Sequence, residues 1–162
     1  MVVLLKLLGS EGPIPVRDLA GQIGFDAAGT HRALRRLGEA GLYSVERRRV
    51  FLAPAEEFLL HAVKFSFPAQ WQSEARGIPT SWAAKPLKDA LADSEGMPPV
   101  WPYSKGAVRG LGLEPLHPIV PEAAQNDSEL AECLALVDAL RSNDSARVTQ
   151  LATTLLQERI GS

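Results

Sequence analysis

Apolar residues recur every three or four positions in the first part of the chain, which is the spacing of helices with one buried face. The pattern predicts three short helices, over residues 2–8, 16–23 and 26–40, and a glycine follows each of them. Asp26 is a favoured N-cap residue for the third helix. Two β-rich runs then flank the polar sequence ERRR, so residues 43–51 are predicted to form a β-hairpin.

Helical patterns also occur directly after the hairpin and at the C-terminal end of the sequence. Proline and two acidic residues open the segment 54–65, as is common at a helix N-terminus. From Pro121 onward the pattern predicts two helices separated by RSND, the first capped by Asp127 or Ser128 and the second by Asp144. Their apolar stripes consist of Leu130, Leu134, Val137 and Leu140 on the first helix and Val148, Leu151, Leu155 and Ile160 on the second.

The middle of the chain gives a weaker pattern, with many of the twelve prolines and all three tryptophans. We expect short strands and loops there, with one short helix near 85–91 and a strand at 107–113. Trp71, Trp82 and Trp101 are expected to pack against other parts of the chain, because a tryptophan buries a large apolar area. Two interpretations stay open: a small core that joins the hairpin to the C-terminal helices, or a pocket for an effector or a groove for a partner protein.

Charge is distributed unevenly along the chain. The whole protein carries a net charge of −2. Residues 1–52 hold eight basic and five acidic side chains, a local net charge of +3, which leaves −5 for the remainder. On a helical wheel, one face of the third helix carries arginines and the opposite face carries apolar residues and Thr30. The arginines on that helix and in the hairpin are Arg32, Arg35, Arg36, Arg47, Arg48 and Arg49.

The sequence LAGQIGFDAAGTHRAL, residues 19–34, resembles the bacterial helix-turn-helix pattern. Ala20 is the small residue where the two helices cross, Gly24 makes the turn, and Thr30 departs from the pattern at a position where valine or isoleucine is usual. The apolar positions of the pattern are Leu19, Ile23, Phe25 and Ala33. With the run HRALRRLGEAGL and the basic hairpin, about residues 1–65 resemble the winged-helix regulators of the MarR and ArsR type.

This resemblance implies that helix 26–40 lies in the major groove of DNA and that the wing, residues 43–51, contacts the backbone or the minor groove. Arg32 would then contact a base edge, whereas Arg35 and Arg36 would contact phosphate. Arginine suits both tasks because its planar, permanently charged group matches guanine and phosphate. The implied DNA-binding residues are Ala28, Gly29, Thr30, His31, Arg32, Arg35, Arg36, Arg47, Arg48 and Arg49.

The expected fold is therefore mainly α with a small β content (α+β). It comprises a winged helix-turn-helix domain over 1–66, a Pro/Trp-rich mixed segment over 67–120 and a C-terminal helical hairpin over 121–162. The expected function is sequence-specific, dimeric repression of transcription on double-stranded DNA. The favoured homodimer contact is the C-terminal hairpin, through Leu134, Val137, Leu151 and Leu155. The alternative is an antitoxin or adaptor whose acidic C-terminal half binds a partner protein.

Other functional classes lack sequence signals. The chain has no phosphate-binding loop, no serine elbow and no HExxH motif, so no enzymatic activity and no cofactor are expected. His31, His61 and His117 are scattered, which predicts no metal site. No apolar stretch approaches the roughly 20 residues that a membrane span needs, so no membrane partner is expected.

The C-terminal helices carry two further predictions. Cys133, the only cysteine, lies on an apolar helix face, which predicts a buried, inert thiol. A lone cysteine also allows no intrachain disulfide and fits a reducing cytoplasm. The acidic residues Glu129, Glu132 and Asp138 are interpreted as a solvated face. The first helix begins without a capping residue, which is compatible with a natural start upstream of Met1.

Overall fold

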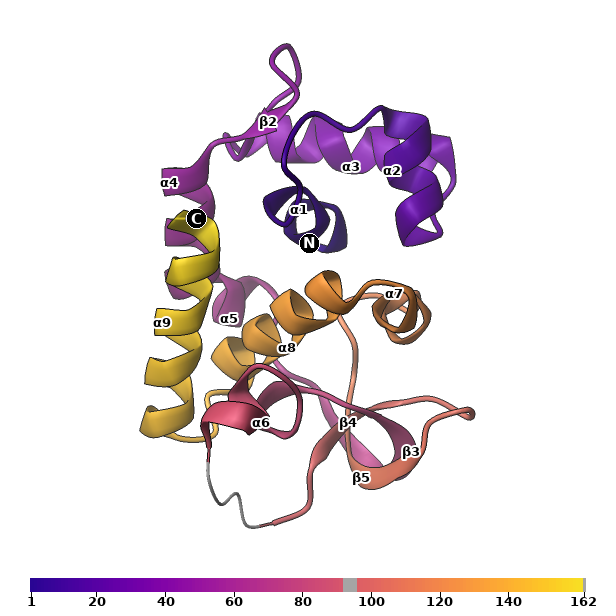
Figure 1. The fold of residues 1–162 in the computed structure, drawn as a ribbon, viewed down its shortest axis with the longest axis vertical. Helices are drawn as coiled ribbons and strands as arrows, with labels where there is room; N and C mark the ends of the chain where they lie inside the picture. Colours follow the sequence, from indigo (N-terminus) through magenta and orange to yellow (C-terminus); the bar gives the residue numbers. More distant parts are fainter. Residues whose placement is uncertain (92–95, 162) are drawn as a thin grey trace.

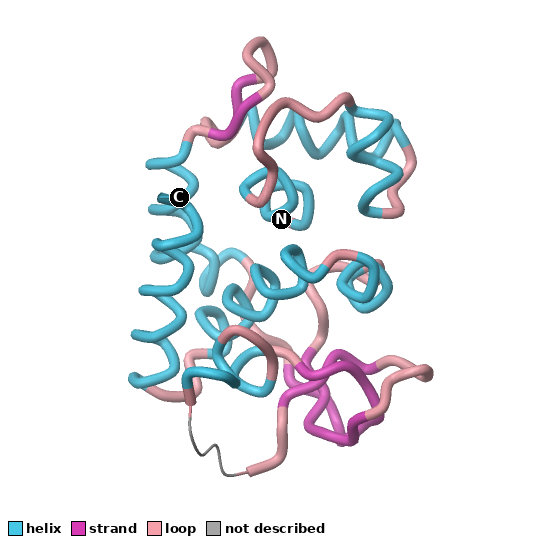
Figure 2. The backbone as a smooth tube through the Cα atoms, in the orientation of Figure 1, coloured by secondary structure: helices cyan, strands magenta, loops and turns pink. Residues whose placement is uncertain are grey.

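The computed structural model describes residues 1–91 and 96–161, and it has a mixed α+β fold in which helices predominate (Figure 1). Figure 2 shows the strands at two opposite ends of the molecule, with helices between them. A short hairpin lies at one end and a small closed barrel of three strands at the other. The coarse α+β prediction is therefore confirmed. None of the helices in the described ranges combines the length and apolar character that crossing a bilayer requires.

The N-terminal elements follow the predicted order. Gly24, with φ of +91°, ends the second helix in the left-handed conformation that glycine adopts at low cost. Asp26 caps the third helix by accepting a hydrogen bond from the backbone N–H of Gly29. These elements are α1 (Val2–Leu8), α2 (Val16–Ile23), α3 (Ala27–Glu39), β1 (Tyr43–Ser44) and β2 (Arg49–Val50). The two strands pair antiparallel, as the sequence predicts.

The helix predicted over 54–65 is present but contains a turn that its sequence did not predict. It consists of α4 (Leu52–Glu57), a π-helical turn η1 (Phe58–Ala62) and α5 (Val63–Ser66). A π-turn inserts one extra residue into a helix and is frequent at functional sites.

The proline-rich middle forms the barrel. Its strands are β3 (Trp71–Pro79), β4 (Pro99–Pro102) and β5 (Val108–Leu113). β3 pairs antiparallel with both others, and β4 pairs parallel with β5. At Gly77 and Gly110, an added Cβ would lie 2.0 Å from a backbone oxygen, so only glycine allows the strands to approach so closely. Between β3 and β4 lie the 3₁₀ turn η2 (Ser81–Ala83) and the predicted short helix α6 (Leu87–Ala90).

The C-terminal third is helical, as predicted. It comprises α7 (Val120–Asn126), α8 (Ser128–Ser142) and α9 (Ala146–Gly161), and α8 packs against α9. Asp127 caps α8 by accepting from the N–H of Leu130. At the start of α9 the hydroxyl of Ser145, not the predicted Asp144, accepts from the N–H of Val148.

α8 is the central helix of the core. It contacts α1, α5, α7, α9 and η2, so its apolar side chains are enclosed from several directions. Leu134 and Val137 are completely buried within the one chain, so the predicted dimer contact through these two residues is wrong. Cys133 is buried, as predicted, and desolvation raises the pKa of its thiol to about 11. The thiol is therefore protonated at neutral pH.

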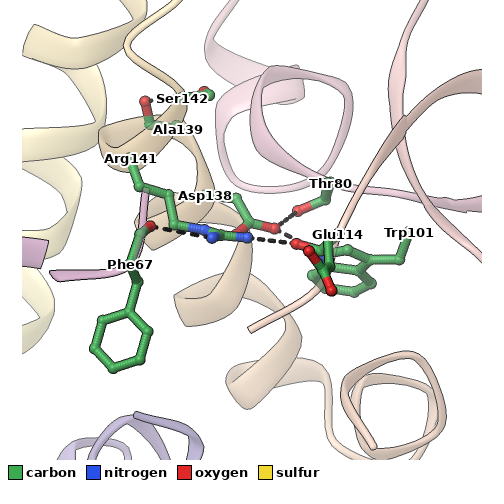
Figure 3. A network of polar contacts seen from close by, with 8 residues as sticks. All are labelled: Phe67, Thr80, Trp101, Glu114, Asp138, Ala139, Arg141 and Ser142. Carbon is green, nitrogen blue, oxygen red and sulfur yellow. Dashed lines mark hydrogen bonds and ion pairs between the residues drawn. The ribbon is translucent and has the colours of Figure 1, made fainter. Parts of the chain in front are cut away.

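A polar network lies inside this core, around Asp138 (Figure 3). The carboxylate is 1% exposed, so its assignment to a solvated face is wrong. One of its oxygens, Oδ2, accepts from Thr80 Oγ1 and Trp101 Nε1, each at 2.7 Å. The other oxygen accepts from Arg141 Nε at 2.8 Å. Burial raises the pKa of Asp138, whereas Arg141 and the other donors act in the opposite direction.

Arg141 also joins segments that are far apart in the sequence. Its Nη1 donates to the carbonyl of Phe67 at 3.2 Å and its Nη2 to the carbonyl of Glu114 at 2.6 Å (Figure 3). These carbonyls lie just before β3 and just after β5, so one guanidinium ties both ends of the barrel to α8. The buried Trp101 belongs to this core, as expected for a tryptophan of the middle segment, whereas Trp71 is 40% exposed.

Removing the carboxylate of this network should destabilise the fold. Asp138→Ala leaves the buried guanidinium of Arg141 without its counter-charge, and we expect a loss of about 3–5 kcal/mol in the free energy of unfolding. Urea denaturation followed by circular dichroism measures it. Glu129→Ala, at an exposed position of the same helix, should cost less than about 1 kcal/mol. Similar losses for the two variants would contradict the role of Asp138.

The ion pair between α1 and the N-terminus of α8 predicts a pH dependence. Lys6 Nζ lies 2.6 Å from Asp127 Oδ2. Burial alone would raise the pKa of Asp127, but the hydrogen bonds from Lys6 and Leu130 hold it below its ordinary value. A carboxyl whose pKa is lower in the folded state stabilises the fold above its unfolded pKa, and this contribution is lost as the pH falls through the folded pKa.

Asp127→Asn keeps a capping side chain but removes the charge. We expect a loss of about 1 kcal/mol in the free energy of unfolding at pH 7, and the difference from the unchanged protein should shrink towards zero as the pH falls through the lowered pKa of Asp127 in the folded state. Denaturant titrations at several pH values test this. A difference that stays constant down to the lowest pH would show that the ion pair does not contribute.

Candidate nucleic-acid interface

α3 presents a basic face to solvent because its apolar face packs against the neighbouring elements. Leu34 and Leu37 are buried, and α3 contacts α1, α2 and β1. Its opposite face carries exposed residues, among them Ala28, His31, Arg32, Arg35, Arg36 and the acidic Glu39. The helical-wheel assignment of the arginines to the polar face is therefore confirmed.

Thr30 does not belong to that face. Its side chain is completely buried, and its hydroxyl donates to the carbonyl of Asp26 at 2.9 Å. It therefore occupies an interior position of the kind that a β-branched apolar residue would fill. Gly29 is half-buried, and its N–H is used by the Asp26 cap. The contact to DNA predicted for the Thr30 side chain is corrected on this ground.

The hairpin carries the second group of arginines. Arg47, Arg48 and Arg49 are all exposed, and the loop that contains the first two extends away from the helical body (Figure 1). Arg48 has φ of +51°, a left-handed conformation unusual for a residue with a side chain. The turn is held in part by the N–H of Arg47, which donates to Ser44 Oγ at 3.1 Å.

A hollow of about 490 Å³ lies between α3 and this hairpin. His31, Arg32 and Arg35 of α3 line it together with Arg48 of the hairpin. We call it the basic hollow. Its other lining residues are Ile14, Val16, Leu34, Tyr43 and Val45. The fold thus brings together cationic groups from two elements that are separated in the sequence, whereas Arg36 lies outside this hollow.

Five residues that line the basic hollow were not predicted as site residues from the sequence, among them Tyr43 and Val45. Tyr43 is buried, which raises the pKa of its hydroxyl, while the nearby charge of Arg48 acts to lower it. Val45 is 61% exposed at the start of the hairpin loop. Both lie in the run LYSV, whose apolar character predicted a strand but gave no signal for a surface role.

The arginines of this interface are scarcely used within the protein. Among the described residues, only Arg35 of the six forms an ion pair, with Glu39 at 3.8 Å. Both partners of that pair are largely exposed, so the pair contributes little and is easily exchanged for another anion. The remaining guanidinium groups are available to a phosphate or a base.

Comparisons with known proteins give no family for this chain: no protein-family model, no curated protein and no solved structure matches it.

Proposed function

We propose that the protein binds double-stranded DNA in a sequence-specific manner and regulates transcription. Residues 1–66 would form a winged helix-turn-helix, with α3 as the recognition helix and the β1–β2 hairpin as the wing. The observation that carries this proposal is the basic hollow, in which Arg32 and Arg35 of α3 and Arg48 of the hairpin surround one space. A DNA backbone offers the regularly spaced negative charges that such an arrangement can bind.

The arginines would have different roles. Arg32 lies on the exposed face in the first half of α3, where a recognition helix contacts base edges, and arginine binds guanine with two hydrogen bonds. Arg35 and Arg36 follow about one turn later and would hold phosphates. Arg48 and its neighbours in the loop would contact the backbone beside the groove. Base contacts supply specificity, and phosphate contacts supply affinity and orientation.

A single recognition helix contacts few base pairs, so we expect two copies of the chain on a two-fold site. Their α3 helices would then lie roughly 34 Å apart, one turn of DNA. Binding of this kind at a promoter would repress transcription by blocking it.

The proposal is tested by fluorescence anisotropy with DNA from upstream of the protein's own gene, against scrambled DNA of equal length, over a series of salt concentrations. Selection from a random DNA library supplies a site if that region contains none. Preferred binding that weakens steeply with salt supports the proposal. Absence of binding to any DNA at low salt would overturn it and favour the adaptor alternative, in which a partner protein co-purifies.

Two substitutions should separate base recognition from phosphate binding. Arg32→Ala should cost about 1–3 kcal/mol on the preferred site and relax specificity at one base pair. Arg48→Ala should weaken binding to all DNA about equally and reduce the salt slope by about one.

Arg109→Ala is the matched control. Arg109 is an exposed arginine of β5, in the barrel at the other end of the molecule, where it pairs with Glu74. It should leave DNA affinity unchanged. Equal losses from Arg32→Ala and Arg48→Ala on every sequence would contradict the assigned roles.

A further inference from the structure

A second hollow lies on the other side of α3 from the hairpin. Its volume is about 1080 Å³, which is large enough for an organic molecule and more than a simple ion needs. We call it the α3 cleft. It lies between α3 and the helix formed by α4 and η1, and the π-turn contributes Phe58, His61 and Ala62 to its wall. The π-turn thus lies at the wall of the cleft, and such turns are frequent at functional sites.

Most of the cleft is apolar. Ala33 and Leu37 of α3 face it from one side and Phe58 from the other. Phe67 and Leu116, from segments before and after the barrel, also line it. Such walls favour the apolar body of a ligand, because its transfer from water is favourable.

The polar groups of the cleft favour an anion. Arg32 and Arg36 lie one turn apart on α3, and both line the cleft. The acidic residues that line it are Asp26 and Glu57. Asp26 already accepts the capping hydrogen bond at the positive end of α3, which offsets its charge. Among the described residues, neither Arg32 nor Arg36 forms an ion pair, so their guanidinium groups are available to an anion.

His117 adds a neutral donor at one end of the cleft. Its ring packs edge-on against Phe25, with ring centroids 4.9 Å apart. Nδ1 accepts a hydrogen bond from the N–H of Ile119, which places the proton of the neutral ring on Nε2. Burial lowers the pKa of His117, which favours this neutral form. Its Nε2–H is then a donor suited to a carboxylate oxygen.

We propose that the α3 cleft binds an organic carboxylate with an apolar body. A carboxylate suits the unpaired guanidinium of Arg36, whose fork matches it with two parallel hydrogen bonds. The aromatic and aliphatic side chains around the cleft enclose the body. This inference does not require that the protein binds DNA.

Isothermal titration calorimetry without DNA tests it, with decanoate as an aliphatic probe and 1-naphthoate as an aromatic one. We expect saturable binding of one molecule per chain for at least one probe. Comparing the two probes shows whether the cleft prefers an aliphatic or an aromatic ligand. Decanol has the same chain without the charge and should bind at least about tenfold more weakly than decanoate.

Arg36→Ala should weaken binding of the better probe by about tenfold to a hundredfold, because a charge-assisted hydrogen bond is lost. Arg35→Ala is the control: it removes the same charge from the adjacent position, which lines the basic hollow and not the cleft. Circular dichroism confirms that both variants are folded. Absence of saturable binding, equal affinity for decanol and decanoate, or equal effects of the two substitutions would overturn the proposal, whatever the outcome with DNA.

Discussion

The buried pair of Asp138 and Arg141 is the interaction on which the arrangement of the barrel and α8 depends. A guanidinium that is taken out of water must be fully hydrogen-bonded, or its burial is strongly unfavourable. Each of the three side-chain nitrogens of Arg141 donates a hydrogen bond, one to the carboxylate of Asp138 and the others to the carbonyls of Phe67 and Glu114 at the two ends of the barrel. If the barrel separated from α8, the guanidinium of Arg141 and the two carbonyls would therefore lose their hydrogen-bond partners. A polar interaction thus fixes the small sheet to α8.

The same helix also determines where the basic face lies. α1 packs on α8, and Lys6 of α1 pairs with Asp127 at the N-terminus of α8. α3 in turn packs on α1. α8 thus connects the N-terminal helices to the barrel, and the ring contact between Phe25 and His117 also joins the segment before α3 directly to the segment after the barrel. The α3 cleft is the space between α3 on one side and η1 and the segment at Leu116 and His117 on the other.

The sequence predicts well what depends on local periodicity. The apolar spacing of α3 identified both its buried face and its arginines, and Gly24 and Asp26 marked the turn before it. Asp138 shows the limit, because its partners Thr80 and Trp101 come from a distant segment and only the fold brings them together. The π-turn was missed for a related reason: helical spacing on both sides of Phe58–Ala62 hides one inserted residue. Thr30 lay on the buried face of the wheel, yet the family resemblance placed it among the DNA contacts.

α3 is a wall shared by two hollows, and Arg32 lines both of them. Arg36 is proposed to hold both a phosphate of DNA and the carboxylate in the cleft, and one guanidinium cannot bind both at the same time. If both proposed ligands bind, each must lower the affinity for the other by the same factor, since coupling between two sites is reciprocal. This coupling needs no movement of the backbone, only a change in the side-chain conformation of an exposed arginine. The basic hollow alone gives no reason to expect that a second ligand would change DNA affinity. That expectation follows from the position of α3 between the hairpin and the π-turn.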